Sequence, residues 1–258
     1  MKNFTFKRQL LFVMFMLLGC LSIQAADDGL ITRQITLKLD EAGTLPNRIG
    51  VSRKNLITNL KIVGKINGTD LKFIREMAGC DFNAEKTDGK LSILDLSEAK
   101  IVAGGDAYFQ SSKKFYTSND KLGNYAFFGC SGLTSLTIPS GVTSIGGAAF
   151  RGCSGLPSLT IPSGVTSIGK SAFLGCSGLT SLTIPSSVTS ISDRAFYGCR
   201  GLTSIYACME KIPTLGSNVF TGCDAKNCIL YVPTGTYDDY LVSDFGYFEN
   251  IVDVISVQ

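Results

Sequence analysis

A phrase of 17 residues dominates the middle of this chain and returns at a fixed spacing. It reads CSGLTSLTIPSGVTSIG from Cys130 to Gly146, and close copies begin 23 residues later at Cys153 and again at Cys176. A fixed period of this length is typical of solenoids, in which each repeat folds into one coil and stacks on the next. One coil cannot bury its apolar side chains alone, so the repeat predicts a core that continues from coil to coil.

Each repeat contains the pattern of two short extended segments. The segment SLTI alternates polar and apolar residues, which is typical of a strand with one buried face, and the proline after it ends that strand. VTSI predicts a second extended segment, and the Ala-Phe pair then returns to the core. The predicted fold class is a β-rich leucine-repeat solenoid with short helical or irregular N-terminal coils and a C-terminal cap. The predicted core of the repeats consists of Leu136, Ile138, Phe150, Cys153, Leu159, Phe173, Cys176, Leu182, Phe196 and Cys199.

The repeat pattern weakens towards both ends, and this divides the chain. We expect a signal peptide over 1–25, an N-terminal cap with degenerate repeats over 26–90, the repeats over 91–233 and an aromatic C-terminal cap over 234–258. A helix is predicted near 70–78, with Asp70 as its N-cap and Gly79 as its C-cap. An insert near 102–121 is predicted to project as a loop.

The N-terminus has the features of a secretory signal peptide. Three basic residues precede an apolar run over 10–21, and cleavage is expected after Ala25. The alternative uses LLGC, which ends at Cys20, as a lipobox, and we expect contact with a membrane only if Cys20 is lipidated. Both interpretations predict an exported protein.

Charge gives no sign of a polyanionic partner. The leader contains three basic and no acidic residues, so its removal takes the 24 basic residues of the chain to 21, equal to the 21 acidic ones. Binding to nucleic acid requires clustered positive charge. We therefore expect no nucleic-acid partner.

The repeat resembles a known family. The phrase AFxxCxxLxxIxIPxxVxxIG, present from Ala126 to Gly146 and in the next two copies, is similar to the BspA-like leucine-rich repeat, a 23-residue class typical of secreted and surface proteins of bacteria and some protozoan parasites. The resemblance covers roughly residues 91–233. It implies a curved solenoid on a bacterial surface or outside the cell that binds other molecules, with adhesion to host matrix proteins or other cells in some members. It implies no catalytic residues.

The composition excludes several kinds of catalytic site. Histidine is absent from the chain, so Ser-His-Asp and Cys-His nucleophiles and histidine-containing zinc sites are excluded. The glycines occupy turn positions of the coils and form no phosphate-binding loop. Asp238 and Asp239 are interpreted as the solvated start of a helix. We predict no enzyme activity, no metal and no cofactor.

A recurring cysteine leaves three interpretations open: a row of buried thiols, a ladder of disulfides or a structural metal site. Stacked equivalents would point their Cβ atoms in parallel, whereas a disulfide requires them to converge. Zinc sites favour close cysteine pairs, which this chain lacks. The pattern therefore favours buried thiols that fill space like a small apolar side chain. Cys208 and Cys228 break the register and are the better disulfide candidates; the disulfide state remains open for Cys80, Cys208, Cys223 and Cys228.

The outward positions of the predicted strands are the candidate binding residues. They carry small hydroxyl side chains that end in a tyrosine: Ser135, Thr137, Ser158, Thr160, Ser181, Thr183 and Tyr206. Tyr108 and Tyr116 of the insert are added as aromatic candidates. These residues either suit an exposed strand or contact an unidentified protein or glycan ligand. A competing hypothesis is a passive or self-associating envelope module without a specific ligand.

Overall fold

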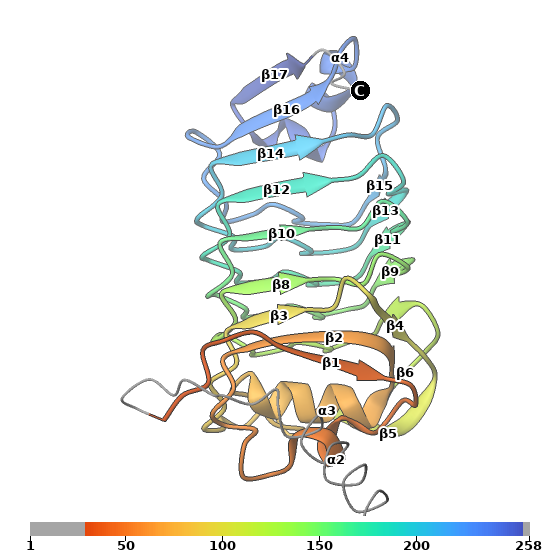
Figure 1. Ribbon diagram of the computed structural model, residues 1–258. Coiled ribbons are helices and arrows are strands. Elements are labelled where there is room, and N and C mark those ends of the chain that lie inside the picture. The colour runs from red at the N-terminus through yellow and green to blue at the C-terminus, as the bar shows by residue number, and fades with distance from the viewer. Residues whose placement is uncertain (1–28, 255–258) are drawn as a thin grey trace, which may run out of the picture.

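The computed structural model describes residues 29–254, so the predicted signal peptide and the alternative lipid site at Cys20 lie outside the described residues. Parallel strands lie one above another along the whole molecule (Figure 1). Every strand pair in the described part is parallel except one hairpin. The prediction of a repeat solenoid is confirmed.

Two rows of strands run along the solenoid. The longer strands form two sheets, in the orders β1-β2-β3-β8 and β10-β12-β14-β16-β17, and β4 pairs with β2. The short strands form a third sheet in the order β15-β13-β11-β9-β7. The longer strands are β1 (Ile35–Leu39), β2 (Asn59–Ile66), β3 (Ile93–Asp95), β4 (Ala99–Ile101), β8 (Ser135–Thr137), β10 (Ser158–Thr160), β12 (Ser181–Ile184), β14 (Ser204–Ala207), β16 (Ile229–Pro233) and β17 (Asn250–Val254). The short strands are β7 (Lys121–Leu122), β9 (Ser144–Ile145), β11 (Ser167–Ile168), β13 (Ser190–Ile191) and β15 (Thr214–Leu215).

A proline interrupts the row of longer strands between β8 and β10. In equivalent coils the residue before the strand is Thr134, Thr180 or Thr203, and its N–H donates to a carbonyl of the preceding coil at 2.8–2.9 Å. Pro157 takes this place in the coil of β10 and has no N–H to donate. The coils stay stacked there because the short strands β9 and β11 remain paired.

The core runs along the solenoid axis as predicted for stacked repeats. All ten predicted core side chains are buried. Five phenylalanines form a continuous stack with ring centroids 5.0–5.8 Å apart and nearly parallel planes. This phenylalanine stack consists of Phe127, Phe150, Phe173, Phe196 and Phe220.

The N-terminal helix has a different cap from the one predicted. Helix α3 (Gly68–Met77) begins after Asn67, whose side chain accepts from Thr69 N–H. Asp70 is the third helical residue and completes a capping box by accepting from Asn67 N–H. The helix ends at Met77 with Ala78 as its C-cap, where Gly79 was predicted, and Gly79 follows with φ 92°. A short helix, α2 (Leu45–Ile49), packs beside α3 and was not predicted.

The insert is a β-hairpin and not a projecting loop. Its strands β5 (Gly104–Gln110) and β6 (Lys114–Thr117) are antiparallel, and the hairpin lies against α3 at the N-terminal end of the molecule (Figure 1). Asp106 N–H donates to Thr69 Oγ1, and the ring of Phe109 stacks on that of Tyr125 at 4.7 Å. These contacts fix the hairpin to both the helix and the first coil.

A buried arginine joins the N-terminal cap to the repeats. The guanidinium of Arg75, on α3, donates to carbonyl oxygens of four residues at 2.8–3.2 Å and lies over the ring of Phe109 at 4.9 Å. The four carbonyls belong to Asp81, Tyr125, Ala126 and Phe128. Three of them lie in the turn of the first complete repeat, so one side chain holds the helix to the solenoid.

The C-terminal cap closes the phenylalanine stack. Helix α4 (Tyr237–Leu241) and the 3₁₀ turn η1 (Asp244–Tyr247) follow β16, and Phe245 and Phe248 contact Phe220 at 5.0 and 5.1 Å. The chain then forms β17, which pairs with β16. This last strand was not predicted.

Candidate functional site

The candidate site is the outer face, which we define as the outward side chains of β8, β10, β12, β14, β16 and β17. Strand pairing aligns Ser158 with Ser181 and Ser204, and Thr160 with Thr183 and Tyr206. Ser135 and Thr137 occupy the same positions on β8, which pairs instead with β3. The structure therefore brings seven of the nine predicted binding residues to one face.

Three exposed threonines on this face, the threonine column, have no hydrogen-bond partner for their hydroxyls in the described part of the chain: Thr137, Thr160 and Thr183. Threonines just before the strands behave differently. The hydroxyls of Thr180 and Thr203 donate to the carbonyl of the preceding coil at 3.0 and 3.1 Å. The threonine column therefore presents its hydroxyls to solvent, as do the exposed Ser135 and Ser158 beside it.

The threonine column ends in two stacked tyrosines. The rings of Tyr206 and Tyr231 are 4.6 Å apart at an angle of 10°, and 41% of Tyr206 is exposed. Val252, also 41% exposed, pairs with Tyr231 and extends this strip. Sequence reasoning missed Tyr231, although it lies two residues before Pro233, as Thr183 lies two before Pro185. Aligning the last strand on its proline would have found it.

Charged groups lie on the N-terminal side of the threonine column. Thr137 pairs with Asp95, and Lys61 contacts both Asp95 and Glu98, at 3.5 and 2.6 Å. Burial raises the pKa of Asp95, but hydrogen bonds from Ser97 and the charge of Lys61 outweigh this effect. The pKa of Asp95 is therefore below its ordinary value. From β8 to β16, the outward strand positions carry no charge.

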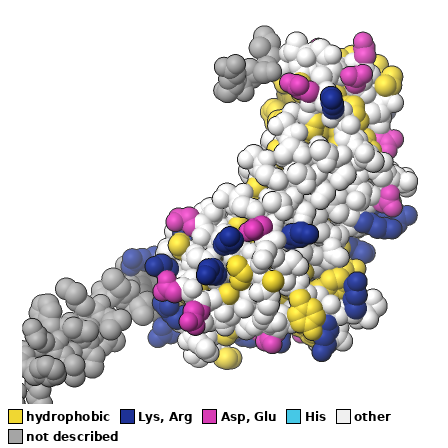
Figure 2. Space-filling view, turned by 90° about the vertical axis from the view of Figure 1, so that its right-hand side faces the viewer, with side chains coloured by type: hydrophobic (Ala, Val, Ile, Leu, Met, Phe, Trp, Pro, Cys, Tyr) yellow, Lys and Arg dark blue, Asp and Glu magenta, His cyan; other side chains and the backbone are white. Residues whose placement is uncertain are grey.

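The flank of the molecule shows a similar distribution. In Figure 2, which faces the short-strand sheet, uncharged surface covers much of the middle coils, and many of the charged side chains gather near the N-terminal end.

The two tyrosines of the insert do not join the outer face. Tyr108 is 1% exposed, its hydroxyl donates to Asn124 O at 2.8 Å, and burial raises its pKa, so its prediction as a binding residue is wrong. Tyr116 is 54% exposed but lies on the hairpin, far along the solenoid from β14 (Figure 1).

The recurring cysteines are buried thiols with a definite hydrogen-bonding role. Each Sγ of this thiol column donates to the carbonyl oxygen of the phenylalanine in the preceding coil, at 3.0–3.3 Å. Burial raises their pKa, to about 12 for Cys176, so the protons needed for these bonds are retained. The thiol column consists of Cys153, Cys176, Cys199 and Cys223. The sequence indicated the burial but not the donor role.

The remaining cysteines are thiols as well. All eight described cysteines are free, including exposed Cys208 and buried Cys228, so the expectation that these two are the better disulfide candidates is not met. The described residues contain no group of three or more His, Cys, Asp or Glu side chains that could hold a metal ion. Among them, no helix is long and apolar enough to cross a membrane.

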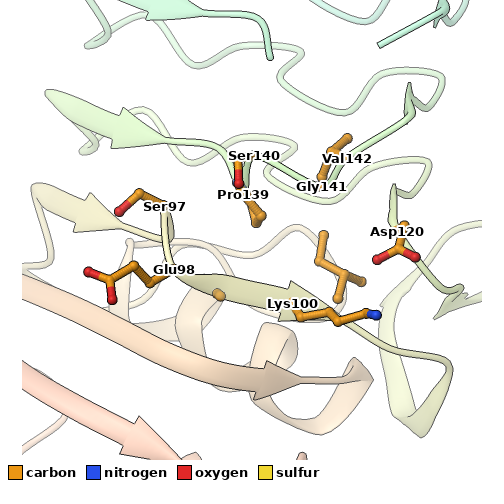
Figure 3. A pocket seen from close by; sticks show the side chains of 10 residues that line it. Ser97, Glu98, Lys100, Asp120, Pro139, Ser140, Gly141 and Val142 are labelled. Atoms are coloured by element: carbon orange, nitrogen blue, oxygen red, sulfur yellow. The ribbon is translucent and has the colours of Figure 1, made fainter. Parts of the chain in front are cut away.

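Two surface depressions lie beside the coils. One, of about 410 Å³, marks the junction of the N-terminal cap and the repeats, with Glu98 and Asp120 on opposite sides (Figure 3). Glu98 forms an ion pair with Lys61, and the backbone carbonyl of Asp120 accepts hydrogen bonds from Thr143, so the Glu98 side chain and the Asp120 backbone serve the fold. The other, of about 550 Å³, is lined by Cys208 and Lys211 near β15.

Stacked coils with one row of longer parallel strands and a continuous apolar core define a leucine-rich repeat solenoid. Residues 108–233 match the BspA type leucine-rich repeat region in six copies, so the repeats of this chain belong to that family. No curated protein matches the sequence.

Solved structures with the same kind of repeat are distant relatives. A leucine-rich repeat protein from Bacteroides ovatus is 31% identical over 50% of this chain and 33% of its own, with a TM-score of 0.36. A leucine-rich cell surface protein from Faecalibacterium prausnitzii is 17% identical over 74% of this chain and 67% of its own (TM-score 0.44). The pneumococcal vaccine antigen PcpA is 15% identical over 90% of this chain and 61% of its own (TM-score 0.40). The match thus spans a third of the length of the B. ovatus protein.

Proposed function

We propose that this chain is an exported, non-enzymatic binding protein that uses its outer face to hold a partner on a host surface or another cell. Membership of a family of bacterial surface-type repeat proteins supports export and binding. The leader supports export by cleavage after Ala25, with lipidation at Cys20 as the alternative. The mass of the exported protein distinguishes the two, because lipidation retains Cys20 and adds acyl chains.

The observation that carries this proposal is the stacked pair of exposed Tyr206 and half-buried Tyr231. Aromatic side chains are enriched among the residues that dominate binding energy. The two rings already stack on each other, so binding a partner would order little that is mobile in the free protein. The neutral surroundings mean that recognition depends on shape and hydrogen bonds and little on charge.

Retention of ligands by the purified chain tests this function. Residues 26–258 are immobilised and exposed to host matrix proteins and to surface glycans, beside Tyr206→Ser. Tyr197→Ser is the matched control, because Tyr197 is 39% exposed but lies in the turn between β13 and β14. We expect the chain and the control to retain a ligand that Tyr206→Ser loses. Equal retention by all three would contradict the proposal.

A second candidate function is a self-associating envelope module. Within the described residues β17 pairs only with β16, which leaves one edge of the last strand without a partner. Unpaired edges can pair with another chain. Light scattering that shows assembly with rising concentration, together with no ligand retained, would favour this function.

A further inference from the structure

The ring of Tyr206 lies at the end of the threonine column, next to Thr183. One face of the ring stacks on Tyr231, and strand pairing places Thr183 beside the other face. Among the described residues, no second ring stacks on Tyr206. A threonine side chain is too short to cover a phenol ring, so this face of Tyr206 is open on the side of the threonine column.

The surface beside this open face of Tyr206 carries unpaired hydroxyls. Thr183, Thr160 and Thr137 follow one another away from Tyr206, and each offers one donor and two acceptor positions. Ser204 and Ser181 beside them already bond to each other at 3.1 Å. Free hydrogen-bonding capacity therefore lies along the threonine column, and also at exposed Ser158 and Ser135 beside it, and it leads to the open face of Tyr206.

A neutral sugar chain has the chemistry that this arrangement complements. The hydroxyls of a sugar ring can exchange hydrogen bonds with the threonines, and its C–H face can pack on an aromatic ring. Neighbouring strands lie about 4.7–4.9 Å apart, close to the length of one sugar ring, so successive residues of a chain could meet successive threonines. The outward strand positions from Thr137 to Tyr231 carry no charge that would favour an acidic or basic ligand, and the nearest charges, Lys61 and Asp95, are paired with each other beyond Thr137. Serine and threonine are under-represented among the residues that dominate protein–protein binding.

We infer that an uncharged oligosaccharide lies along the threonine column and packs one sugar ring on the open face of Tyr206. This inference rests on the proposed binding function and specifies its ligand class. Both the hydroxyls and the aromatic face are required, because hydroxyls alone would exchange bonds with water at little gain.

Affinity electrophoresis tests the ligand class. The 26–258 chain is run through gels that contain laminarin, mannan, xyloglucan or dextran, with hyaluronan as the acidic control. We expect retardation by at least one neutral polysaccharide and none by hyaluronan. Tyr206→Ser should abolish the retardation, and Tyr197→Ser should leave it unchanged. Absence of retardation by all four neutral polysaccharides would overturn the inference.

A second variant separates a sugar from a protein ligand. Thr183→Val keeps the shape of the side chain and removes its hydroxyl. We expect the apparent affinity for the polysaccharide to fall about five- to tenfold, the value of one hydrogen bond. A protein that packs only apolar groups on Thr183 would bind equally well or more tightly. If matrix proteins are retained through Tyr206 while no polysaccharide binds, the inference fails and the proposed function stands. If nothing is retained at all, both fail.

Discussion

At the scale of single residues, each cysteine of the thiol column contributes both to packing and to hydrogen bonding. Cysteine fills the space beside the phenylalanine stack and also donates to a carbonyl in the preceding coil. Alanine would leave the space empty, and serine would bring a more polar group into the core. Packing and hydrogen bonding together explain why the same residue type recurs in these coils.

The buried thiols predict a loss of stability in alkaline solution. The ordinary thiol pKa is 9.0, and burial raises it to about 12 for Cys130, Cys176 and Cys223. The unfolded chain thus releases these protons near pH 9 while the folded chain keeps them to about pH 12. Their stabilising contribution is complete below pH 9 and is lost as the pH rises through this window.

Urea denaturation at a series of pH values measures this effect. We expect the unfolding midpoint to fall above about pH 9. Cys176→Val should show a smaller slope, because it removes one titrating thiol from the core. A midpoint that stays constant up to about pH 11 would contradict the assigned burial of these thiols.

Two single residues, Tyr108 and Asp70, show why some predictions from the sequence were wrong. Tyr108 was predicted to be exposed because it lies in a polar insert, but its ring is buried against Asn124 by contacts between distant segments. Asp70 was taken as the helix N-cap, although Asn67 with Asp70 three positions later is the signature of a capping box. The first error is one of tertiary context, and the second could have been avoided.

At the scale of elements, the phenylalanine stack links the cores of successive coils. Phe173 lies between Phe150 and Phe196, at 5.0 and 5.1 Å. We expect Phe173→Ala to destabilise the protein by about 3–5 kcal/mol, as measured by calorimetry. Tyr197→Ala, on the exposed turn of the next coil, should change stability by less than about 1 kcal/mol. A loss below about 1 kcal/mol for Phe173→Ala would show that the register of the stack is wrong.

The interruption at Pro157 predicts a change in hydrogen exchange with little change in stability. In Pro157→Thr, the new N–H can donate to the preceding coil as Thr180 and Thr203 do. The hydrogen bond adds about 1 kcal/mol, but losing proline costs about 0.4–1 kcal/mol through the unfolded chain, so the two nearly cancel. The amide of residue 157 should be protected in NMR exchange. Fast exchange of that amide would contradict the explanation.

The elements of the central repeats follow from local pattern, whereas those of the ends do not. The strands β8, β10 and β12 are each followed by a proline and a turn, and similar coils give similar neighbours. The hairpin β5–β6 depends on α3, and β17 depends on β16 as a template. Long-range contacts of this kind leave no periodic signal in the sequence.

At the scale of the whole molecule, Arg75 couples the N-terminal cap to the repeats. Its four carbonyl partners would all lose a charged donor in Arg75→Met, and hydrogen bonds to charged groups contribute about 1.5–3 kcal/mol each before relaxation. We expect a single unfolding transition for the native chain and a separate, earlier transition of the cap in the variant. Circular dichroism of the helix and tyrosine fluorescence follow the two parts. Coincident transitions in the variant would show that other contacts hold the cap.

At this scale the repeats present an uncharged row of outward strand positions from β8 to β16, with Tyr206 at the end of the threonine column. Footprinting tests this account most directly. The chain is exposed to hydroxyl radicals with and without a polysaccharide that retards it, and the oxidation of each tyrosine is measured by mass spectrometry. Tyr206 and Tyr231 should lose reactivity on binding. The exposed Tyr116, Tyr197 and Tyr237 should keep theirs. Unchanged oxidation of Tyr206, or protection confined to the other three, would contradict the account.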